Sequence, residues 1–382
     1  MRIETKFVDC DKDFHLARSV RLRIYGKEIV APKRALSASG NRIFNEVILQ
    51  NEALRGLVEV YRRLDPNKVH KILNDNVAAA RFSVEISFSI REVKEDEIIL
   101  GLFEYDAQGK MPTLDHTNML LHILNNPHFD AVAVPFIPKL PCEDYIQFLE
   151  SFIEVYKSSS FRPALAPFIP HYSISSVPAL FSFYAKKDIF ENNLICVDFN
   201  GSNPISQYMF VSAIVKEAIK LEKETDQTVF LHAVNLKYGK ATKRLEVVPA
   251  KDLVIFTMGF NSFGSNHKRV AILNDVGVHE LKTKLLNRDD YGYYSLEAVR
   301  NRMEDTQRYQ IRMNDVVNNK KLAKLFNAER QGLESVKISE EIKERELKRY
   351  LLSKRQIANE QLIWKRISKV HNKALQKTLL EA

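Results

Sequence analysis

Residues 130–138, Asp130-Ala131-Val132-Ala133-Val134-Pro135-Phe136-Ile137-Pro138, begin the part of the chain that decides its fold, which continues to Gly264. Short runs of apolar and β-branched residues alternate there with longer runs that have helical spacing. The expected strands are Ala131–Phe136, Pro163–Phe168, Leu194–Phe199, Val229–Val234 and Leu253–Met258. The expected helices are Glu143–Tyr156, Ile174–Tyr184 and Tyr208–Glu222, followed by a shorter fourth connection. An apolar strand followed by an amphipathic helix is typical of a parallel sheet covered on both faces.

Two of these strands carry the same tetrapeptide. Pro135-Phe136-Ile137-Pro138 recurs 32 residues later as Pro167-Phe168-Ile169-Pro170. Repetition of one β–α unit is compatible with a (β/α)8 barrel or with an open, doubly wound sheet. No G-x-G-x-x-G or Walker loop follows any expected strand, which argues against the open nucleotide-binding sheet. We therefore predict an α/β protein built on a (β/α)8 TIM-type barrel.

The 382 residues are enough for one barrel of about 250 residues with additions at both ends. We predict N-terminal strands that pack on the barrel in residues 1–45, the barrel itself in residues 46–295, and a basic helical extension in residues 296–382. Other expected elements are a β-hairpin around Tyr25-Gly26-Lys27, a helix over Asn45–Leu64, and strands over Arg81–Ile90 and Ile98–Tyr105.

The composition also indicates in which compartment the protein works and which cofactors it lacks. No apolar run approaches the ~20 residues of a membrane span, and the charged N-terminus lacks the apolar stretch of a signal peptide. Cys10, Cys142 and Cys196 are too scattered for a disulfide framework and lack metal-ligand spacing. We expect a cytoplasmic protein with reduced thiols, no membrane association, no metal and no cofactor.

Polar residues end or follow the expected strands, at the face where barrel enzymes hold their ligands. They are Asp106, Asp198, Asn200, Gly201, His232, Asn261 and His267. Carboxylates, amides and imidazoles over an apolar floor are a common ligand-site design. Each has an ordinary structural interpretation as well: a strand-end Asp often caps the next helix, and His232 is as readily a hydrogen-bonded core residue. Asp106 and Asp198 are the candidate catalytic carboxylates, and the others are candidate substrate-binding residues.

The order of motifs over residues 15–270 resembles the tRNA-guanine transglycosylase family, barrel enzymes that exchange guanine for a 7-deazaguanine base in RNA, with relatives acting on DNA. The matching stretches are Ala17–Gly26 with Ala31-Pro32 for the family's A-R-x-G-x-L opening, Phe103–Gly109 for D-S-G-G-F, Phe230–Asn235 for L-H-x-x-G, and Met258–Ser265 for G-x-D-x-F-D-S. The resemblance implies that Asp106 is the base-binding or general-acid carboxylate and that Asp198–Gly201 belong to the base-recognition wall.

Two departures from the family pattern affect function. Gly264 stands where the family has its nucleophilic Asp, and Asn261 stands where it has the neighbouring Asp. Without a carboxylate the covalent ribosyl intermediate cannot form. The family's C-x-C-x-x-C…H zinc site is also missing. We favour a pseudoenzyme that binds RNA, DNA or a ribonucleoprotein. An active base-exchange enzyme (a pentosyltransferase) with a relocated carboxylate, for which Asp198 is the candidate, stays open, and an unrelated small-molecule barrel enzyme is third.

The net charge of +9 is concentrated near the C-terminus, where residues 320–382 hold 16 Lys and Arg against 8 Glu. A localised basic element predicts a polyanionic partner, usually nucleic acid. Solvated charge on an ordinary helix is the other interpretation. We expect tRNA or DNA as the partner, contacted by Arg349, Arg355, Lys365 and Arg366. A homo-oligomer or a protein partner through the C-terminal helices stays open.

Overall fold

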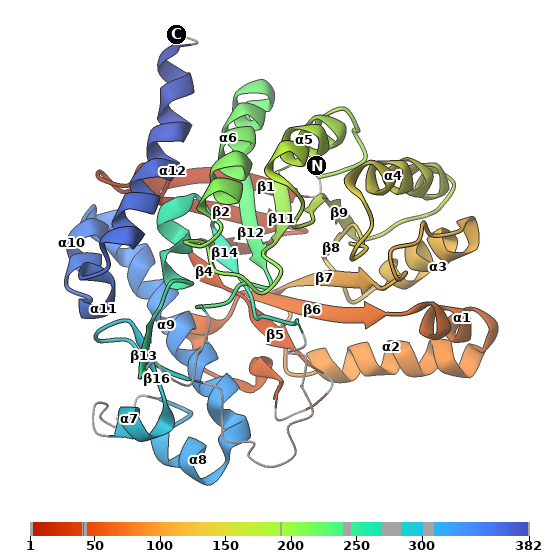
Figure 1. Ribbon diagram of the computed structural model, residues 1–382. Coiled ribbons are helices and arrows are strands. Elements are labelled where there is room, and N and C mark those ends of the chain that lie inside the picture. Colours follow the sequence, from red (N-terminus) through yellow and green to blue (C-terminus); the bar gives the residue numbers. More distant parts are fainter. Residues whose placement is uncertain are drawn as a thin grey trace.

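The computed structural model describes residues 3–39, 41, 44–191, 193–239, 246–268, 284–300 and 309–380 (Figure 1). It is an α/β fold with two five-stranded parallel sheets. The first has the order β5 (Leu36–Ala38), β6 (Leu57–Leu64), β7 (Ile98–Tyr105), β8 (Ala131–Ala133), β9 (Ala164–Ala166). The second has the order β10 (Phe168–Ile169), β11 (Leu194–Asp198), β12 (Phe230–Val234), β14 (Ser262–Phe263), β4 (Lys33–Arg34).

The chain passes directly from one sheet to the other at two places. A single residue, Ala35, separates β4 from β5, and a single residue, Pro167, separates β9 from β10. Within the described residues neither sheet closes on itself. Of the predicted barrel, the mixed α/β class and the parallel strands are therefore confirmed.

Helices follow the strands and lie around them (Figure 1). They are α1 (Pro66–Asn74), α2 (Asn76–Ile90), α3 (Leu114–Leu124), α4 (Cys142–Lys157), α5 (Val177–Ala185), α6 (Tyr208–Thr225), α7 (Leu296–Arg300), α8 (Met313–Asn318), α9 (Ala323–Glu344), α10 (Leu347–Leu352), α11 (Arg355–Ala358) and α12 (Gln361–Leu380). Short 3-10 helices cover Glu46–Ile48, Glu52–Leu54, Ile174–Ser176, Leu253–Met258 and Lys320–Leu322. The expected helices before β9, β11 and β12 are confirmed in α4, α5 and α6.

An antiparallel N-terminal sheet covers the amino ends of the parallel strands. It consists of β1 (Ile3–Cys10), β2 (Arg18–Ile24) and β3 (Lys27–Val30), so the predicted hairpin is confirmed. The amide of Asn193, just before β11, donates to Ile3 O at 2.8 Å, and Lys27 Nζ lies 2.8 Å from Asp130 Oδ2, just before β8. In the described part of the chain this sheet therefore covers the end of the strands opposite to their carboxyl ends.

The C-terminal helices pack against the rest of the fold. A small antiparallel sheet of β13 (Val247–Pro249), β16 (Gly292–Tyr294) and β15 (Leu285–Asn287) precedes them. Helix α9 lies against β4, where Ser335 Oγ accepts the Arg34 N–H at 3.2 Å. Helix α12 lies beside α6 (Figure 1) and buries Ile363, Ile367 and Val370. The apolar residues that were expected at helical spacing therefore form the buried face of α12.

Three expected elements are wrong in type. Arg81–Ile90 is the C-terminal part of α2, whose first turn is capped by Asp75 Oδ1 accepting the Val77 N–H at 2.8 Å. Its alternating apolar residues include an i, i+4, i+8 series, Phe82, Ile86 and Ile90, which is buried, while the rest face solvent. Alternation of period two contains this helical series, so the pattern could not distinguish the two structures.

The expected helix Asn45–Leu64 is instead two 3-10 turns and strand β6, and the expected strand Leu253–Met258 is a 3-10 helix followed by β14. In β6 the first four residues, Leu57 to Val60, are all buried. A strand buried on both faces loses the alternation that would identify it. Continuous apolar runs of this length fit either a buried strand or a buried helix.

Candidate functional site

The carboxyl ends of β6, β7 and the loop after β14 enclose a cavity of about 210 Å³. Its lining residues are Tyr61, Arg63, Glu104, His267 and Lys268. Tyr61 and Arg63 lie on the second half of β6, and Glu104 lies next to the last residue of β7. The opposite ends of the strands are covered by β1–β3. The cavity is therefore at the end of the strands where (β/α) folds bind ligands.

Glu104 is the centre of charge in this cavity. Its Oε1 lies 3.3 Å from Arg63 Nε, and its Oε2 lies 3.3 Å from Lys268 Nζ and accepts the Tyr61 hydroxyl. Arg63 continues to Asp106 through a second ion pair. The two cations and the two carboxylates balance, so the cavity presents donors and an acceptor without a large net charge. Such a lining favours a polar ligand of little net charge.

A second carboxylate, Glu59, lies directly beneath the cavity and is completely buried. It accepts hydrogen bonds from His232 Nε2 at 2.8 Å, His267 Nε2 at 3.2 Å and the Ser265 N–H at 3.1 Å. Burial opposes ionisation of this carboxyl, but the bonds from the two imidazoles outweigh it and lower the pKa of Glu59 to about 2. Glu59 is therefore a carboxylate at neutral pH.

Gly264 leaves the space that the Glu59 carboxylate fills. A Cβ atom at position 264 would overlap Oε1, Oε2 and Cδ of Glu59. Its backbone φ is not in the left-handed region, so the requirement for glycine here is one of space and not of conformation. The site therefore holds a carboxylate beside position 264, supplied by a different strand.

Asp198, the last residue of β11, is almost completely buried. Its Oδ1 accepts the Asn235 amide at 2.8 Å and the Asn200 N–H at 3.0 Å. Burial raises the pKa of Asp198, while the Lys268 charge and the Asn235 hydrogen bond oppose that rise. Asn235 also accepts the His267 N–H at 3.0 Å, so it joins Asp198 to the cavity wall.

The structure brings most of the predicted rim residues together. His267 lines the cavity, Asp106 binds Arg63 at its edge, and Asp198 contacts the wall through Asn235. Asn200 and Gly201 both have positive φ, 48° and 74°, in the turn after β11. A Cβ at Gly201 would lie 3.8 Å from the Asn266 amide and 3.9 Å from Lys268 Cβ, which places this turn against the cavity loop.

Two predicted residues have structural roles instead of lining the cavity. His232 is buried, and its ring nitrogens contact Ser262 Oγ at 2.7 Å and Glu59 Oε1 at 2.8 Å. This is the hydrogen-bonded core position that was one of its two interpretations. Asn261 is also buried, and its Oδ1 accepts the Leu231 N–H at 2.9 Å, near the start of β12. Its amide therefore links two strands below the rim.

Five residues of the site were not among the predicted ones: Glu59, Tyr61, Arg63, Glu104 and Lys268. The first three lie in the stretch expected to be a helix, which placed them on no strand. Glu104 lies two residues before the predicted Asp106, and Lys268 directly follows the predicted His267. A signal was present: a Glu in an otherwise apolar run of four, Leu57 to Val60, is an unusual buried carboxylate and requires a partner.

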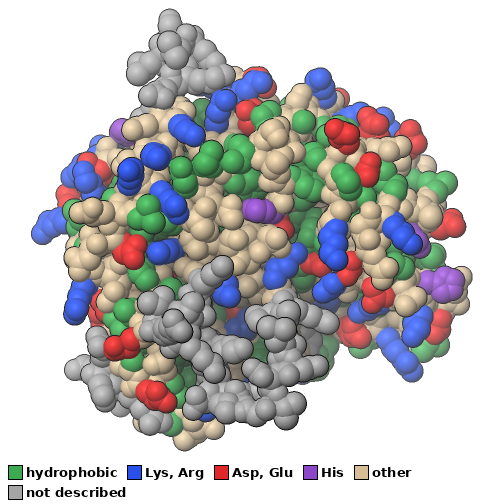
Figure 2. Space-filling model, in the orientation of Figure 1, with side chains coloured by type: hydrophobic (Ala, Val, Ile, Leu, Met, Phe, Trp, Pro, Cys, Tyr) green, Lys and Arg blue, Asp and Glu red, His purple; other side chains and the backbone are tan. Residues whose placement is uncertain are grey.

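The predicted nucleic-acid contacts fall on α10, α11 and α12. Arg349, Arg355 and Lys365 are exposed, and Arg349 only approaches Glu346, at 3.9 Å. Arg366 is half-buried: its Nη1 donates to Ile205 O at 2.7 Å and its guanidinium lies 5.1 Å from the Tyr208 ring centre. Figure 2 shows Lys and Arg side chains gathered over α12 and the adjacent part of α6.

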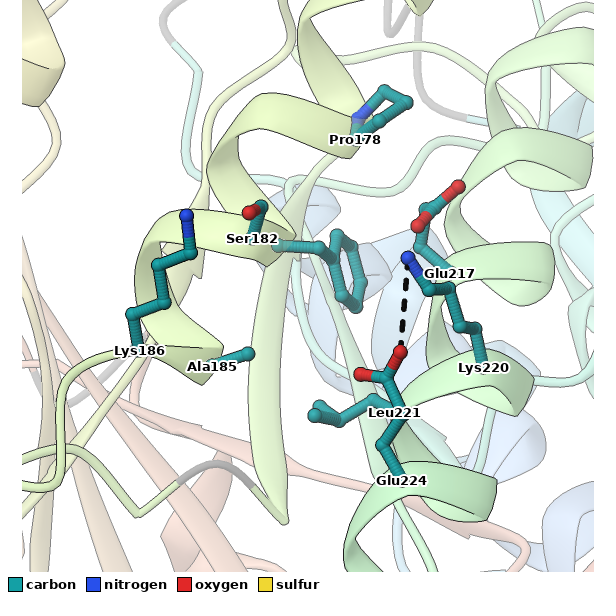
Figure 3. A pocket seen from close by; sticks show the side chains of 9 residues that line it. Pro178, Ser182, Ala185, Lys186, Glu217, Lys220, Leu221 and Glu224 are labelled. Atoms are coloured by element: carbon teal, nitrogen blue, oxygen red, sulfur yellow. Dashed lines mark ion pairs between the residues drawn. The ribbon is translucent and has the colours of Figure 1, made fainter.

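A larger hollow lies on the outside of the fold, between α5 and α6 (Figure 3). Its volume is about 500 Å³, and Glu217, Lys220 and Glu224 form one wall, with Lys220 and Glu224 paired at 3.7 Å. Ser182 and Lys186 lie opposite. Glu217 is mostly buried, whereas Ser182, Lys186, Lys220 and Glu224 are exposed side chains of two neighbouring helices.

No protein-family model matches this chain, and no curated protein matches it. In the described ranges no helix is both long and apolar enough to span a bilayer. The same residues contain no cluster of three His, Cys, Asp or Glu side chains arranged to hold a metal ion. Both imidazoles beside Glu59 are hydrogen-bonded to it.

Proposed function

We propose that the protein binds nucleic acid through the cationic face of α12 and receives a nucleotide base in the cavity formed by Tyr61, Arg63, Glu104, His267 and Lys268. In this proposal it is a barrel protein of the tRNA-guanine transglycosylase type that has lost the nucleophile, so it binds without exchanging the base. The observation that carries the proposal is the unneutralised stripe of lysines on α12.

The stripe consists of Lys365, Lys369 and Lys373, which are four residues apart and exposed. Residues at this spacing lie on one face of a helix, and the opposite face is buried against the fold. The stretch 361–374 contains no Asp or Glu, and none of the three lysines pairs with a carboxylate among the residues that are described. Lys337 on α9, by contrast, pairs with Glu341 at 2.9 Å. Unpaired charge on a rigid face favours phosphate binding.

The loop after β11 connects the stripe to the cavity wall. Arg366 binds Ile205 O, and Lys369 lies 5.6 Å from the ring centre of Tyr208 at the start of α6. Ile205 is only four residues from Gly201, a span of about 14 Å at full extension, and Gly201 adjoins Lys268 in the cavity wall. A bound strand that follows the stripe would therefore have a base within reach of the cavity.

A closed ring of eight strands underlies this proposal. Chain continuity through Ala35 joins β4 to β5, and chain continuity through Pro167 joins β9 to β10. Backbone bonds support the same ring at both junctions: Ala35 N–H donates to Phe263 O at 2.8 Å, and Cys196 N–H donates to Pro167 O at 3.0 Å. The two sheets are then the two halves of one (β/α)8 barrel.

The loss of catalysis is inferred from position 264. The transglycosylase pattern requires a carboxylate on the side chain there, and Gly264 has none. The nearby Glu59 carboxylate is completely buried under His267, and all three of its hydrogen bonds hold it in place. A nucleophile must reach the sugar carbon, and Glu59 in this position cannot.

An active base-exchange enzyme is the second candidate, because Glu104 is a carboxylate that does line the cavity. It takes the place of Asp198, the candidate chosen from the sequence, whose carboxyl is buried and bound to Asn235. Incubating the protein with guanine-containing RNA or DNA and a 7-deazaguanine base, followed by denaturing electrophoresis, tests this alternative. A covalent adduct that disappears in Glu104→Gln would establish it and overturn the binding-only proposal.

The binding proposal is tested by fluorescence anisotropy with labelled tRNA and duplex DNA over a series of salt concentrations. The triple variant Lys365→Gln, Lys369→Gln, Lys373→Gln should reduce the slope of log K against log salt by about 2 to 3. The matched control removes three exposed lysines from other helices and loops, Lys71, Lys110 and Lys157. Equal losses in both triple variants, or no binding by the unmodified chain, would refute it.

A further inference from the structure

The imidazole of His267 is fixed on two sides within the cavity wall. Its Nε2 lies 3.2 Å from Glu59 Oε2, and its ring stacks on Tyr61 with centroids 4.3 Å apart and planes 6° apart. Its backbone N–H is held by Asn235. A ring that is stacked and hydrogen-bonded in this way has one orientation, so its two nitrogens have separate roles.

The neighbouring carboxylate decides which nitrogen carries the proton. An ionised carboxylate only accepts hydrogen bonds, so Nε2 of His267 must be the donor. In the neutral ring Nδ1 then carries the lone pair. Nδ1 contacts no hydrogen-bonding group in the described parts of the chain, although the side chain lines the cavity. Nδ1, the unprotonated nitrogen of the ring, is therefore the one available to a ligand.

The second imidazole on Glu59 is in a different position. Both ring nitrogens of His232 are already hydrogen-bonded, to Ser262 and to Glu59, and the ring is completely buried. His232 therefore supports the carboxylate and has no nitrogen left for chemistry. Of the two histidines, His267 is the one able to exchange a proton with a bound molecule.

The charged and titratable groups around His267 suit a ligand that loses a proton. They are Glu59, Tyr61 and Arg63 from β6, Glu104 from β7, Asp198 from β11, His232 from β12 and Lys268 from its own loop. Lys268 Nζ also lies 4.5 Å from the Phe136 ring centre, which fixes it at the cavity wall. A negative charge forming on the ligand would face two cations, while Glu104 could accept another donor of the same ligand.

The cavity limits the size of that ligand. Sites for drug-sized molecules begin at about 300 Å³, and this one encloses about 210 Å³. Since Arg63 and Lys268 are already paired with Glu104 and Asp106, we infer that the ligand is a small molecule or group that is neutral before it reacts. A nucleobase fits this description, and so does any small heterocycle or alcohol with an acidic N–H or O–H.

We propose that His267 is a general base of this cavity: Nδ1 takes a proton from an N–H or O–H of a small neutral ligand, and Glu59 is the positioning residue that orients the ring and stabilises the imidazolium. The ligand's N–H or O–H bond breaks and the Nδ1–H bond forms. The electron pair stays on the ligand atom, where Lys268 and Arg63 face it, and the reverse transfer returns the proton. This goes beyond nucleic-acid binding and does not depend on it.

The experiment examines the histidine itself in the full chain. Two-bond 1H–15N NMR of the imidazole rings reports which nitrogen carries the proton, and diethyl pyrocarbonate followed by mass spectrometry reports which rings have a free, unprotonated nitrogen. We expect the Nε2–H form for His267 and fast modification of this ring, while His232 stays unmodified. A proton on Nδ1, or modification of His267 no faster than that of His232, would overturn the proposal without any variant.

The Glu59→Gln variant tests the role of the carboxylate. A side-chain amide can either donate or accept a hydrogen bond, so it no longer requires a proton on Nε2, and the fraction of His267 rings in the Nε2–H form should fall in the two-bond 1H–15N spectrum. Glu150→Gln, on the exposed side of α4, is the matched control and should change nothing. An unchanged Nε2–H fraction of His267 in a folded Glu59→Gln chain would show that Glu59 only packs there.

Discussion

The substitution Gly264→Ala examines the most crowded point of the site. The added Cβ would overlap the Glu59 carboxylate, which is completely buried and cannot move into solvent. Three hydrogen bonds hold that carboxylate, from His232, His267 and the Ser265 N–H. Any movement large enough to admit a methyl group breaks at least two of them and leaves a buried charge poorly paired.

The cost follows from those bonds. A hydrogen bond to a charged group contributes about 1.5–3 kcal/mol, so losing two costs about 3–6 kcal/mol. That agrees with the 3–5 kcal/mol typical of removing one partner of a buried charge. We expect Gly264→Ala to lower the free energy of unfolding by about 3 kcal/mol or more, measured by urea denaturation followed by circular dichroism.

A double-mutant cycle separates this explanation from a general intolerance of position 264. Glu59→Ala removes the atoms that a Cβ would overlap, at the cost of the hydrogen bonds from His232, His267 and the Ser265 N–H. In that background Gly264→Ala should cost less than about 1 kcal/mol, so the coupling energy should exceed ~2 kcal/mol. If Gly264→Ala costs the same with and without Glu59, the carboxylate is not what excludes a side chain, and the reasoning fails.

Three further predictions concern packing and pH. Gly332→Ala on α9 should destabilise the fold by about 1–3 kcal/mol, because its Cβ would overlap Leu54 Cδ2. This cost should exceed the preference of alanine for a helix, which is about 1 kcal/mol. In urea denaturation a Leu54→Ala background should remove the cost, and a cost that persists would contradict the prediction. Asp198→Asn should raise the melting temperature at pH 7, since burial raises the pKa of Asp198 and the folded state disfavours its charged form. The gain in melting temperature should shrink as acid protonates the carboxyl of the unmodified chain. A variant that melts at a lower temperature at pH 7 would contradict this prediction. Glu59 has a depressed pKa of about 2, so its charge stabilises the folded state above the unfolded pKa of about 4.3, and this stabilisation is lost as the pH falls through about 2. The difference in free energy of unfolding between the unmodified chain and Glu59→Gln should narrow over that pH range. A constant difference would show that the charge does not contribute to stability.

Local patterns predicted much of the fold. The strands from β8 to β12 and the helices between them follow from apolar runs that alternate with amphipathic ones, and the hairpin at Tyr25-Gly26 follows from its turn residues. The pattern failed for α2, for β6 and for the 3-10 helix Leu253–Met258, where the same residues fit more than one structure. Phe82, Ile86 and Ile90 fit an alternating strand and a helical stripe equally, and burial on both faces removed the alternation from β6.

The candidate site could be predicted only in part, for a physical reason. Parallel strands bring their carboxyl ends together whatever the loops contain, so a polar rim with Asp106, Asp198 and His267 was available from the order of elements. The residues that line the cavity come from the neighbouring strands β6 and β7 and from the loop after β14, and their ion pairs depend on register. Glu104 meets Lys268 only because β7 and the loop after β14 converge across the fold.

The amino-acid order by itself determined the α/β class, the cationic C-terminal helix and the absence of a carboxylate at Gly264, because these are properties of local composition and spacing. Only the tertiary structure decided that a carboxylate from β6 fills the space beside that glycine and that His267 has Nδ1 directed away from Glu59. Distances between side chains far apart in the chain are set by strand register and packing, and no short-range pattern encodes them.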